Sequence, residues 1–415
     1  MNYEWIKSVA KISNDDMTIE FNDSFNQKIE PNTLPENLTA LTFGCNFNQK
    51  IEPNTLPKDL SNLTFGHEFN QKIKQNTLPE KLTTLIFGFY FNQKIEPKTL
   101  PKSLTTLTFG WHFNQKIESN ILPENLITLT FGHNFNQKID PNTLPENLTT
   151  LIFGYYFNQK IEPKILPDNL TSLTFGYCFN PKIDSKILPS NFNQKIEPNT
   201  LPENLITLTF GNNFNQGIDP NTLPKNLTSL TFGYWFNQKI EPNTLPENIT
   251  SLTFGNNFNQ EIDPNTLPKN LITLTFGYRF NQKIEPNTLP ETLTTLIFGE
   301  SFNQKIDSEM LPSNLKNINF NLMDLNNVYP NKHYFEMVNN IPDYYHVKLF
   351  LERNIFDDDD GPKWPIHVLY YNEDEWPLEI YEIQDEYKHS LHGSVTTLIN
   401  KKTYQPYSST KSALK

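Results

Sequence analysis

The dominant feature of the sequence is a repeat of 22 residues. Phe-Asn pairs begin at residues 25, 47, 69, 91, 113, 135, 157 and 179, and after one step of 13 residues they resume at 192 and recur every 22 residues to 302. This spacing gives 12 complete repeats, a shortened repeat at 179–191 and a degenerate one at 302–323. A period of this length is typical of stacked-repeat proteins, in which each repeat buries its apolar face against its neighbours.

Each repeat is predicted to form one coil of a solenoid. In the repeat at 47–68, Leu63 and Phe65 alternate with Thr64, so a short strand directs the two apolar side chains inward and Thr64 outward. Pro57 favours an extended or 3₁₀ return path. The chain has only 3 alanines against 31 prolines, which also disfavours helix. The predicted fold class is therefore mainly β: a parallel-sheet solenoid.

Positions within a repeat are numbered 1 to 22 from its Phe. Phe at position 1, Ile at 5, Leu at 10 and Phe at 19 are predicted to form the core. Gly at position 20 indicates either a positive φ or a close approach of neighbouring backbones. Asn at position 2 is expected to bond the backbone of adjacent coils. Lys at position 4 and an acid at position 6 favour a solvated, self-neutralising ladder over a basic stripe that binds a partner.

These motifs carry a resemblance to a known family. The run Phe-Asn-Gln-x-Ile, followed by Leu-Pro-x-x-Leu-x-x-Leu-x-Phe-Gly, resembles the FNIP repeat over roughly residues 25–322. That family is regarded as a variant of leucine-rich repeats and occurs in social amoebae and in giant viruses that infect amoebae. The resemblance implies 22-residue leucine-rich-repeat-like coils. Many members carry an N-terminal F-box, and residues 1–24 are too short for one, so a ubiquitin-ligase adaptor role is not expected to carry over.

The ends of the repeat array are expected to act as caps. Residues 1–24 are predicted to form an N-terminal cap with a decayed first strand, residues 25–323 the solenoid, and residues 324–415 a small mixed α/β C-terminal cap or domain. Within the last region, residues 364–371 alternate as a strand does, and residues 378–387 are compatible with a helix.

The shortened repeat at 179–191 lacks the nine residues equivalent to a strand and its turn. We therefore expect a short coil there, with a defect or kink in the sheet and weaker local stability.

Positions 21 and 22 vary while nearly everything else is copied from repeat to repeat. They follow the strand and its Gly, so they should line one edge of the sheet. One interpretation is a recognition strip, since aromatic and Arg side chains are enriched where proteins bind; the other is drift at an unconstrained surface. The candidate partner-binding residues are Phe89, Tyr90, Trp111, His112, His133, Tyr155, Tyr156, Tyr177, Tyr234, Trp235, Tyr278 and Arg279.

Composition excludes several classes of function. The net charge of −12 and a pI near 5.2 argue against binding of nucleic acid. The sequence contains no apolar run long enough to span a membrane and no secretory signal, so a cytoplasmic location is expected, in the host if the protein is viral. Cys45 and Cys178 lie too far apart to pair or share a metal. The acidic run at 357–360 does not fit an EF-hand. No cofactor or metal is predicted.

The leading hypothesis is a non-catalytic scaffold that binds an unidentified protein partner through the sheet face and the variable strip. A second hypothesis is carbohydrate binding, with aromatic faces stacked on sugar rings. A third is an enzyme in residues 324–415, with His367, Glu373, Asp374 or His389 as acid–base groups, although no motif known for catalysis is present.

Overall fold

The computed structural model describes residues 3–15, 17–178, 196–306 and 308–323, together with four short segments of the C-terminal region. The chain divides into two compact bodies, an N-terminal body (Met1–Leu227) and a C-terminal body (Thr228–Lys415). No helix in the described part of the chain is long and apolar enough to cross a membrane.

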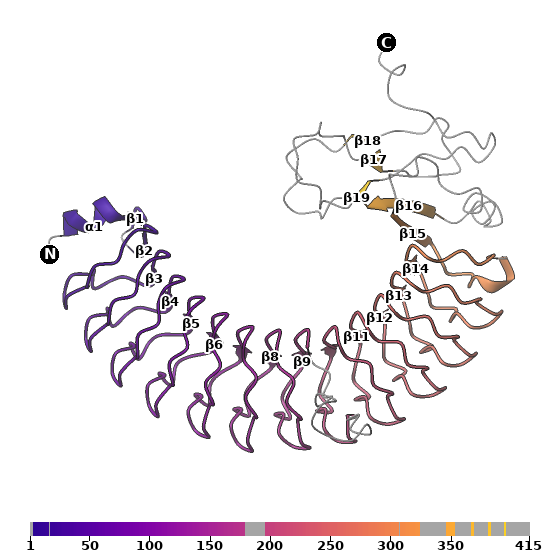
Figure 1. The fold of residues 1–415 in the computed structure, drawn as a ribbon, viewed down its shortest axis with the longest axis horizontal. Helices are drawn as coiled ribbons and strands as arrows, with labels where there is room; N and C mark the ends of the chain where they lie inside the picture. Colours follow the sequence, from indigo (N-terminus) through magenta and orange to yellow (C-terminus); the bar gives the residue numbers. More distant parts are fainter. Residues whose placement is uncertain are drawn as a thin grey trace, which may run out of the picture. The chain divides into compact units, whose positions relative to one another are not determined.

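The N-terminal body is a stack of coils whose strands lie side by side (Figure 1). Each strand from β2 onward pairs in parallel with the next in the same register, so Leu41, Leu63 and Leu85 are neighbours across the sheet. The decayed first strand predicted before the repeats is β2, and β1 covers its free edge in antiparallel pairing. The elements are α1 (Tyr3–Val9), β1 (Ala10–Ile12), β2 (Thr18–Phe21), β3 (Ala40–Thr42), β4 (Asn62–Thr64), β5 (Thr84–Ile86), β6 (Thr106–Thr108), β7 (Thr128–Thr130), β8 (Thr150–Ile152), β9 (Ser172–Thr174) and β10 (Thr207–Thr209).

The C-terminal body repeats this architecture. Strands β11 to β15 pair in parallel, β16 continues the sheet beside β15, and β19 pairs antiparallel with β16. The strand predicted at 364–371 is confirmed at β17, which lies within it. The helix predicted at 378–387 is wrong, because that range contains the strand β18, which pairs antiparallel with β17. The elements are β11 (Ser229–Thr231), β12 (Ser251–Thr253), β13 (Thr273–Thr275), β14 (Thr295–Phe298), the 3₁₀ helix η1 (Ser308–Met310), β15 (Asn317–Met323), β16 (His346–Glu352), β17 (His367–Val368), β18 (Tyr381–Glu382) and β19 (Ser394–Val395).

Two parallel rows of phenylalanine form the spine of the core. Phe43 at position 19 stacks on Phe47 at position 1 with ring centroids 3.9 Å apart. Phe43 also stacks on Phe65 of the next coil at 5.6 Å, and Phe47 on Phe69 at 6.1 Å. These side chains are at most 3% exposed. The predicted core positions are therefore confirmed, and each buried aromatic ring stabilises the stack by about 1.5–3 kcal/mol.

Glycine at position 20 is required by close approach, and the alternative of a positive φ is wrong. No glycine in the described residues has a positive φ. Instead, a Cβ built on Gly110 would lie 1.7 Å from the carbonyl oxygen of Gly88 in the preceding coil, and nine other glycines at this position meet the same obstruction. Adjacent coils therefore approach at this point as closely as backbone atoms allow.

The positive φ occurs instead at position 8, which the sequence analysis did not single out. The residue there has φ between 60° and 66° in twelve repeats, and it is Asn in all but Lys98 and Lys164. Asn tolerates the left-handed region better than other residues with a Cβ. This turn starts the return path of each coil.

Asn at position 2 bonds between coils as predicted. The Asn48 side-chain oxygen accepts hydrogen bonds from the backbone N–H of Asn70 at 3.0 Å and from the side chain of Gln71 at 3.0 Å. The same pair of bonds recurs along the described repeats, for example from Asn92 and Gln93 to Asn70. Gln at position 3, which every repeat but the shortened one carries, thus has a structural role that the sequence analysis did not identify.

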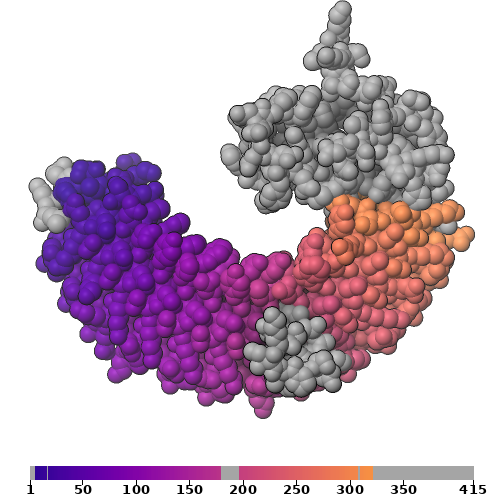
Figure 2. Space-filling view, viewed as in Figure 1, coloured from indigo at the N-terminus to yellow at the C-terminus, as the bar shows by residue number. Residues whose placement is uncertain are grey.

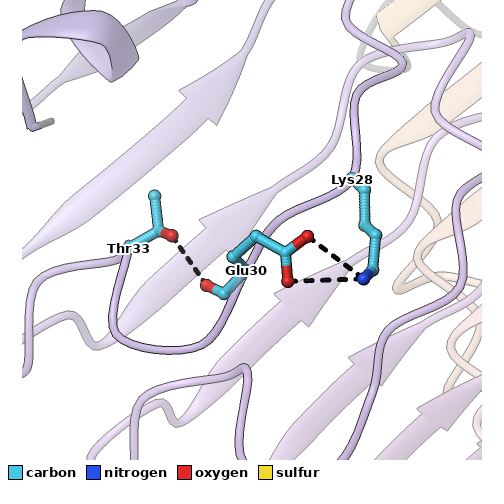
Figure 3. Close-up of polar contacts among 3 residues, drawn as sticks. All are labelled: Lys28, Glu30 and Thr33. Atoms are coloured by element: carbon cyan, nitrogen blue, oxygen red, sulfur yellow. Dashed lines mark hydrogen bonds and ion pairs between the residues drawn. The ribbon is translucent and has the colours of Figure 1, made fainter. Parts of the chain in front are cut away.

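Lysines at position 4 pair with acids at position 6, within one coil and between coils. Lys28 Nζ lies 3.1 Å from Glu30 Oε1, beside a bond of 2.7 Å from the Thr33 hydroxyl to the Glu30 carbonyl (Figure 3). Lys116 reaches Asp140 in the next coil at 2.8 Å. These side chains are exposed, so each pair contributes little to stability, and the row is the self-neutralising ladder that was expected.

The prediction of a defect in the sheet at the shortened repeat is wrong. β9 pairs directly with β10 in the usual parallel register, with Leu173 opposite Leu208. Phe175 and Phe210 stack at 6.2 Å across this junction. The sheet therefore continues without a missing strand, although 35 residues rather than 22 separate the two leucines. Residues 179–191 lie outside the described part of the chain.

Candidate functional site

Positions 21 and 22 form a turn directly after each strand, at one rim of the sheet. The backbone N–H at position 22 donates to the carbonyl at position 21 of the preceding coil, as from Tyr90 to His67 at 2.9 Å and from His112 to Phe89 at 2.9 Å. This ladder continues the coil-to-coil bonding beyond the strand. The strip therefore lies at the rim rather than on the sheet face, and its backbone donors at position 22 are already satisfied.

In the N-terminal body, the rings at position 21 form a continuous row, in which His67 is tilted by 30° against Phe89 and the later pairs are stacked. Their centroids lie 3.5–5.8 Å apart, with the closest pair at Trp111 and His133, whose planes are within 8°. We call this row the aromatic ladder; its members are His67, Phe89, Trp111, His133, Tyr155 and Tyr177.

Position 22 adds a second, shorter row beside the ladder. Tyr90 stacks on His112 at 5.0 Å, and the His112 Nδ1 is 3.2 Å from the Asn134 side-chain nitrogen. Tyr156 meets Tyr155 edge-on at 4.8 Å. Tyr90 is 43% exposed and Tyr156 50% exposed. Figure 2 shows the N-terminal body as a continuous surface in which side chains fill the spaces between coils.

Formally charged residues are rare along the ladder, with Glu68 beside its first ring, His67. From Phe89 to Cys178, positions 21 and 22 contain no Asp, Glu, Lys or Arg. Burial lowers the pKa of His133 below its ordinary value, which favours the uncharged imidazole. Burial, followed by the neighbouring Tyr177, raises the pKa of Tyr155, which keeps that phenol protonated. From Phe89 onward the surface therefore presents ring edges with nitrogen and hydroxyl groups and no carboxylate, ammonium or guanidinium group.

The strip of the C-terminal body is built differently. Tyr234 and Trp235 meet edge-on at 5.1 Å, and the next coil carries Asn256 and Asn257 at the same positions. Tyr278 follows one coil further on, beside Arg279. The exposed fractions of the three aromatic side chains are 40%, 47% and 43%, in chain order. Here an aromatic coil alternates with an asparagine coil, so no aromatic row forms across these coils.

The structure shows no assembled catalytic or metal site within the residues it describes. No group of three His, Cys, Asp or Glu side chains there is arranged to hold a metal ion. A hydrogen bond with the Asp23 carboxylate raises the pKa of Cys45, and burial raises the pKa of Cys178, so neither thiol is activated as a nucleophile. Of the acid–base candidates in the C-terminal region, His367 lies in β17, and Glu373, Asp374 and His389 lie outside the described residues.

The chain is similar to several solved structures. The giant-virus protein CroV588, described as a novel circular leucine-rich-repeat protein structure, is 48% identical over 82% of this chain, with a TM-score of 0.65. This chain spans 54% of the length of that protein. A leucine-rich-repeat protein from Eubacterium ventriosum is 13% identical, covering 75% of this chain and 91% of its own, with a TM-score of 0.19. No protein with curated annotation matches significantly.

The family comparison covers the whole repeat array. The FNIP Repeat family model matches eleven segments, which overlap from residue 18 to 191 and continue through 192–234, 236–279 and 280–322. These matches follow the coils that the structure shows and include the shortened repeat. The chain therefore belongs to the FNIP-repeat family of leucine-rich-repeat-like solenoids.

Proposed function

We propose that this protein is a non-catalytic scaffold that binds a partner protein along the aromatic ladder of its N-terminal body. The observation that carries the proposal is the continuous row of six neighbouring rings, on a solenoid whose other positions are nearly identical from repeat to repeat. Leucine-rich-repeat solenoids generally act as scaffolds, which supports the class of function.

The composition of the ladder region favours recognition over drift. Nine of the twelve side chains at positions 21 and 22 of the six ladder coils are aromatic or His, and the three others are Glu68, Asn134 and Cys178. Drift on a solvated turn would be expected to admit Lys, Glu and Ser, which are abundant on protein surfaces. Tyr and Trp give rigid contact area with a polar tip and dominate the energetics of protein interfaces.

The geometry of the ladder favours a protein over a stacking ligand. A sugar ring or a nucleobase binds the free face of an aromatic ring, and the faces in the ladder are covered by the next ring along, as at Trp111 and His133. What remains accessible is a row of ring edges with nitrogen and hydroxyl groups. At about 4.8 Å per coil, the five steps of the ladder span roughly 24 Å, a length that an extended segment of seven residues matches.

Affinity capture with matched variants tests the proposal. The ladder variant changes the exposed residues Tyr90, Trp111 and Tyr156 to Ser, and the control changes Ile127 and Ile206 to Ser. These isoleucines are each 45% exposed but belong to position 15, just before the strand, and so lie away from the rim. Lysate of the native host cells supplies the partners, and quantitative mass spectrometry measures their retention.

We expect a partner that the intact protein and the control retain and that the ladder variant loses by at least tenfold. Melting curves of all three proteins establish that each is folded. Equal retention by the ladder variant, or equal loss by both variants, would contradict binding at the ladder.

A further inference from the structure

We propose that Tyr155 and Tyr177 form an oxidative crosslinking site, and that the aromatic ladder conducts the oxidation to them from Trp111. The reagent is a diffusible one-electron oxidant, such as a peroxyl radical, and the product is a dityrosine bond between two neighbouring coils. Crosslinking needs only the rings of the ladder, so it is independent of the partner binding proposed for the same surface.

The two tyrosines are held face to face. Their ring centroids lie 4.4 Å apart, and their planes are within 5° of parallel. The preceding strands are in register, with Thr150 opposite Ser172. The turns are also fixed to each other, because the backbone N–H of Cys178 donates to the Tyr155 carbonyl at 2.7 Å. Both rings are half-buried at the rim, so they stay close together and still have room to turn when a bond forms between them.

Trp111 is the point at which the oxidation enters the ladder. Its side chain is 39% exposed, and it is the only tryptophan among the six ladder residues. Phenylalanine and histidine rings are harder to oxidise than an indole, and a phenol loses an electron readily only as its proton leaves. A one-electron oxidant in solvent therefore takes an electron first from Trp111 and leaves an indole radical cation.

One ring separates Trp111 from the tyrosine pair. His133 stacks on Trp111 at 3.5 Å with the planes within 8°, and on Tyr155 at 5.8 Å with the planes within 10°. Rings at these distances are close enough for an electron to pass from Tyr155 to the oxidised indole. Burial lowers the pKa of His133 and favours its uncharged form. An uncharged imidazole spares the radical cation the repulsion that an imidazolium so close to it would exert.

Each tyrosine loses one electron and one proton in the reaction. Tyr155 gives an electron to the Trp111 radical cation, which restores the neutral indole, and releases its phenolic proton to water. Tyr177 then gives a hydrogen atom to Tyr155 through the hydrogen bond between the two phenols, and a second oxidation of Trp111 regenerates the radical at Tyr155. The two phenoxyl radicals couple through ring carbons ortho to oxygen, and each of these carbons passes its hydrogen to its phenolic oxygen. Two electrons go to the oxidant and two protons to water.

Tyr234 provides a contrast within the same chain. It meets Trp235 edge-on, at an interplanar angle of 66°, so it also has a tryptophan in contact. The coils on either side carry Asn212 and Asn256 at the equivalent position. Tyr234 therefore has an oxidisable neighbour but no tyrosine one coil away, and we expect no crosslink between coils there.

Photo-oxidation of the dilute full chain tests the proposal. Illuminated ruthenium tris(bipyridine) with persulfate supplies the one-electron oxidant, and peptide mapping by mass spectrometry locates each dityrosine. Trypsin cleaves between the two tyrosines at Lys160 and Lys164, so their crosslink joins two separate peptides. We expect this crosslink in monomeric protein. Trp111→Phe and His133→Ala should each lower its yield at least fivefold. Trp5→Phe, which removes a tryptophan from α1 of the same body, is the control and should leave the yield unchanged.

Two results would overturn the proposal. If Trp111 is oxidised and no peptide pair joined through Tyr155 and Tyr177 is found, the stacked tyrosines are not a crosslinking site. If Trp111→Phe gives the same yield as the intact protein, the ladder does not conduct the oxidation. Melting curves taken before illumination establish that each variant is folded. The crosslinked protein should melt at a higher temperature than the unmodified one, because a bond between two coils restricts the unfolded chain.

Discussion

Replacing a single glycine by alanine where two neighbouring coils meet should disrupt the stacking of the coils. In Gly110→Ala, the new Cβ lies 1.7 Å from the carbonyl oxygen of Gly88 and 2.5 Å from its carbon. An ordinary contact needs more than 3 Å, so the two coils must separate by roughly 1.5 Å. Both obstructing atoms belong to the backbone, and therefore no side-chain rotation relieves the overlap.

That separation breaks hydrogen bonds between the same two coils. The bonds from His112 N to Phe89 O and from Phe87 N to Thr108 O are each 2.9 Å long, and an opening of 1.5 Å takes them beyond bonding distance. Losing two buried bonds, together with the cost of their unpaired groups, gives an expected destabilisation of about 3–5 kcal/mol.

Urea denaturation followed by circular dichroism measures the effect, with hydrogen exchange of the flanking peptides to localise it, because repeat stacks open in parts. Gly217→Ala is the matched control. Gly217 lies at position 4, where most repeats carry Lys, and its φ is not positive. The control should change stability by less than about 0.5 kcal/mol. A Gly110→Ala variant as stable as this control would refute the close-approach argument.

Three further changes test other features of the coil. Lys98→Asn should stabilise the protein by about 0.5–1 kcal/mol, because Lys98 has φ of 62° where most repeats use Asn; Lys102→Asn, at an exposed site outside the positive-φ set, should not. Thr99→Val should be neutral or stabilising by about 1 kcal/mol in urea denaturation, because the Thr99 hydroxyl is buried with no partner. Thr105→Val should instead destabilise, since that hydroxyl donates to a backbone carbonyl at 3.1 Å. Deletion of residues 179–191 restores a 22-residue spacing across a junction that is already in register, so its melting temperature should equal or exceed that of the intact protein; a large drop would contradict this.

The sequence predicted the coil well because repetition reveals what every coil needs. Burial of Leu63 and Phe65 followed from alternation, and the bonds of Asn48 followed from the demand of buried backbone for partners. The role of Gly66 was left between two alternatives, since a missing side chain is equally compatible with a positive φ and with a close contact. The positive φ at Asn54 could have been predicted, because an Asn directly after a proline is typical of a turn. The sequence analysis considered only the spacing of the apolar residues and did not use this dipeptide.

The remaining differences have physical reasons as well. The defect expected after residues 179–191 does not appear in the sheet because strand pairing depends on register, and the chain between two strands can be longer without altering it. The stacking of Trp111 on His133 could not be predicted from spacing alone, since it depends on the rotamers that two variable side chains adopt together.

Site-specific photo-crosslinking tests most directly whether the aromatic ladder is a recognition surface. A photoreactive phenylalanine replaces Tyr156, which is 50% exposed beside the ladder, and in a second protein replaces Ile127, which is 45% exposed away from the rim. If the ladder binds a partner, irradiation in host-cell lysate should give a discrete crosslinked species from position 156 and none from position 127. The same species from both positions, or a species from position 127 alone, would contradict recognition by the ladder.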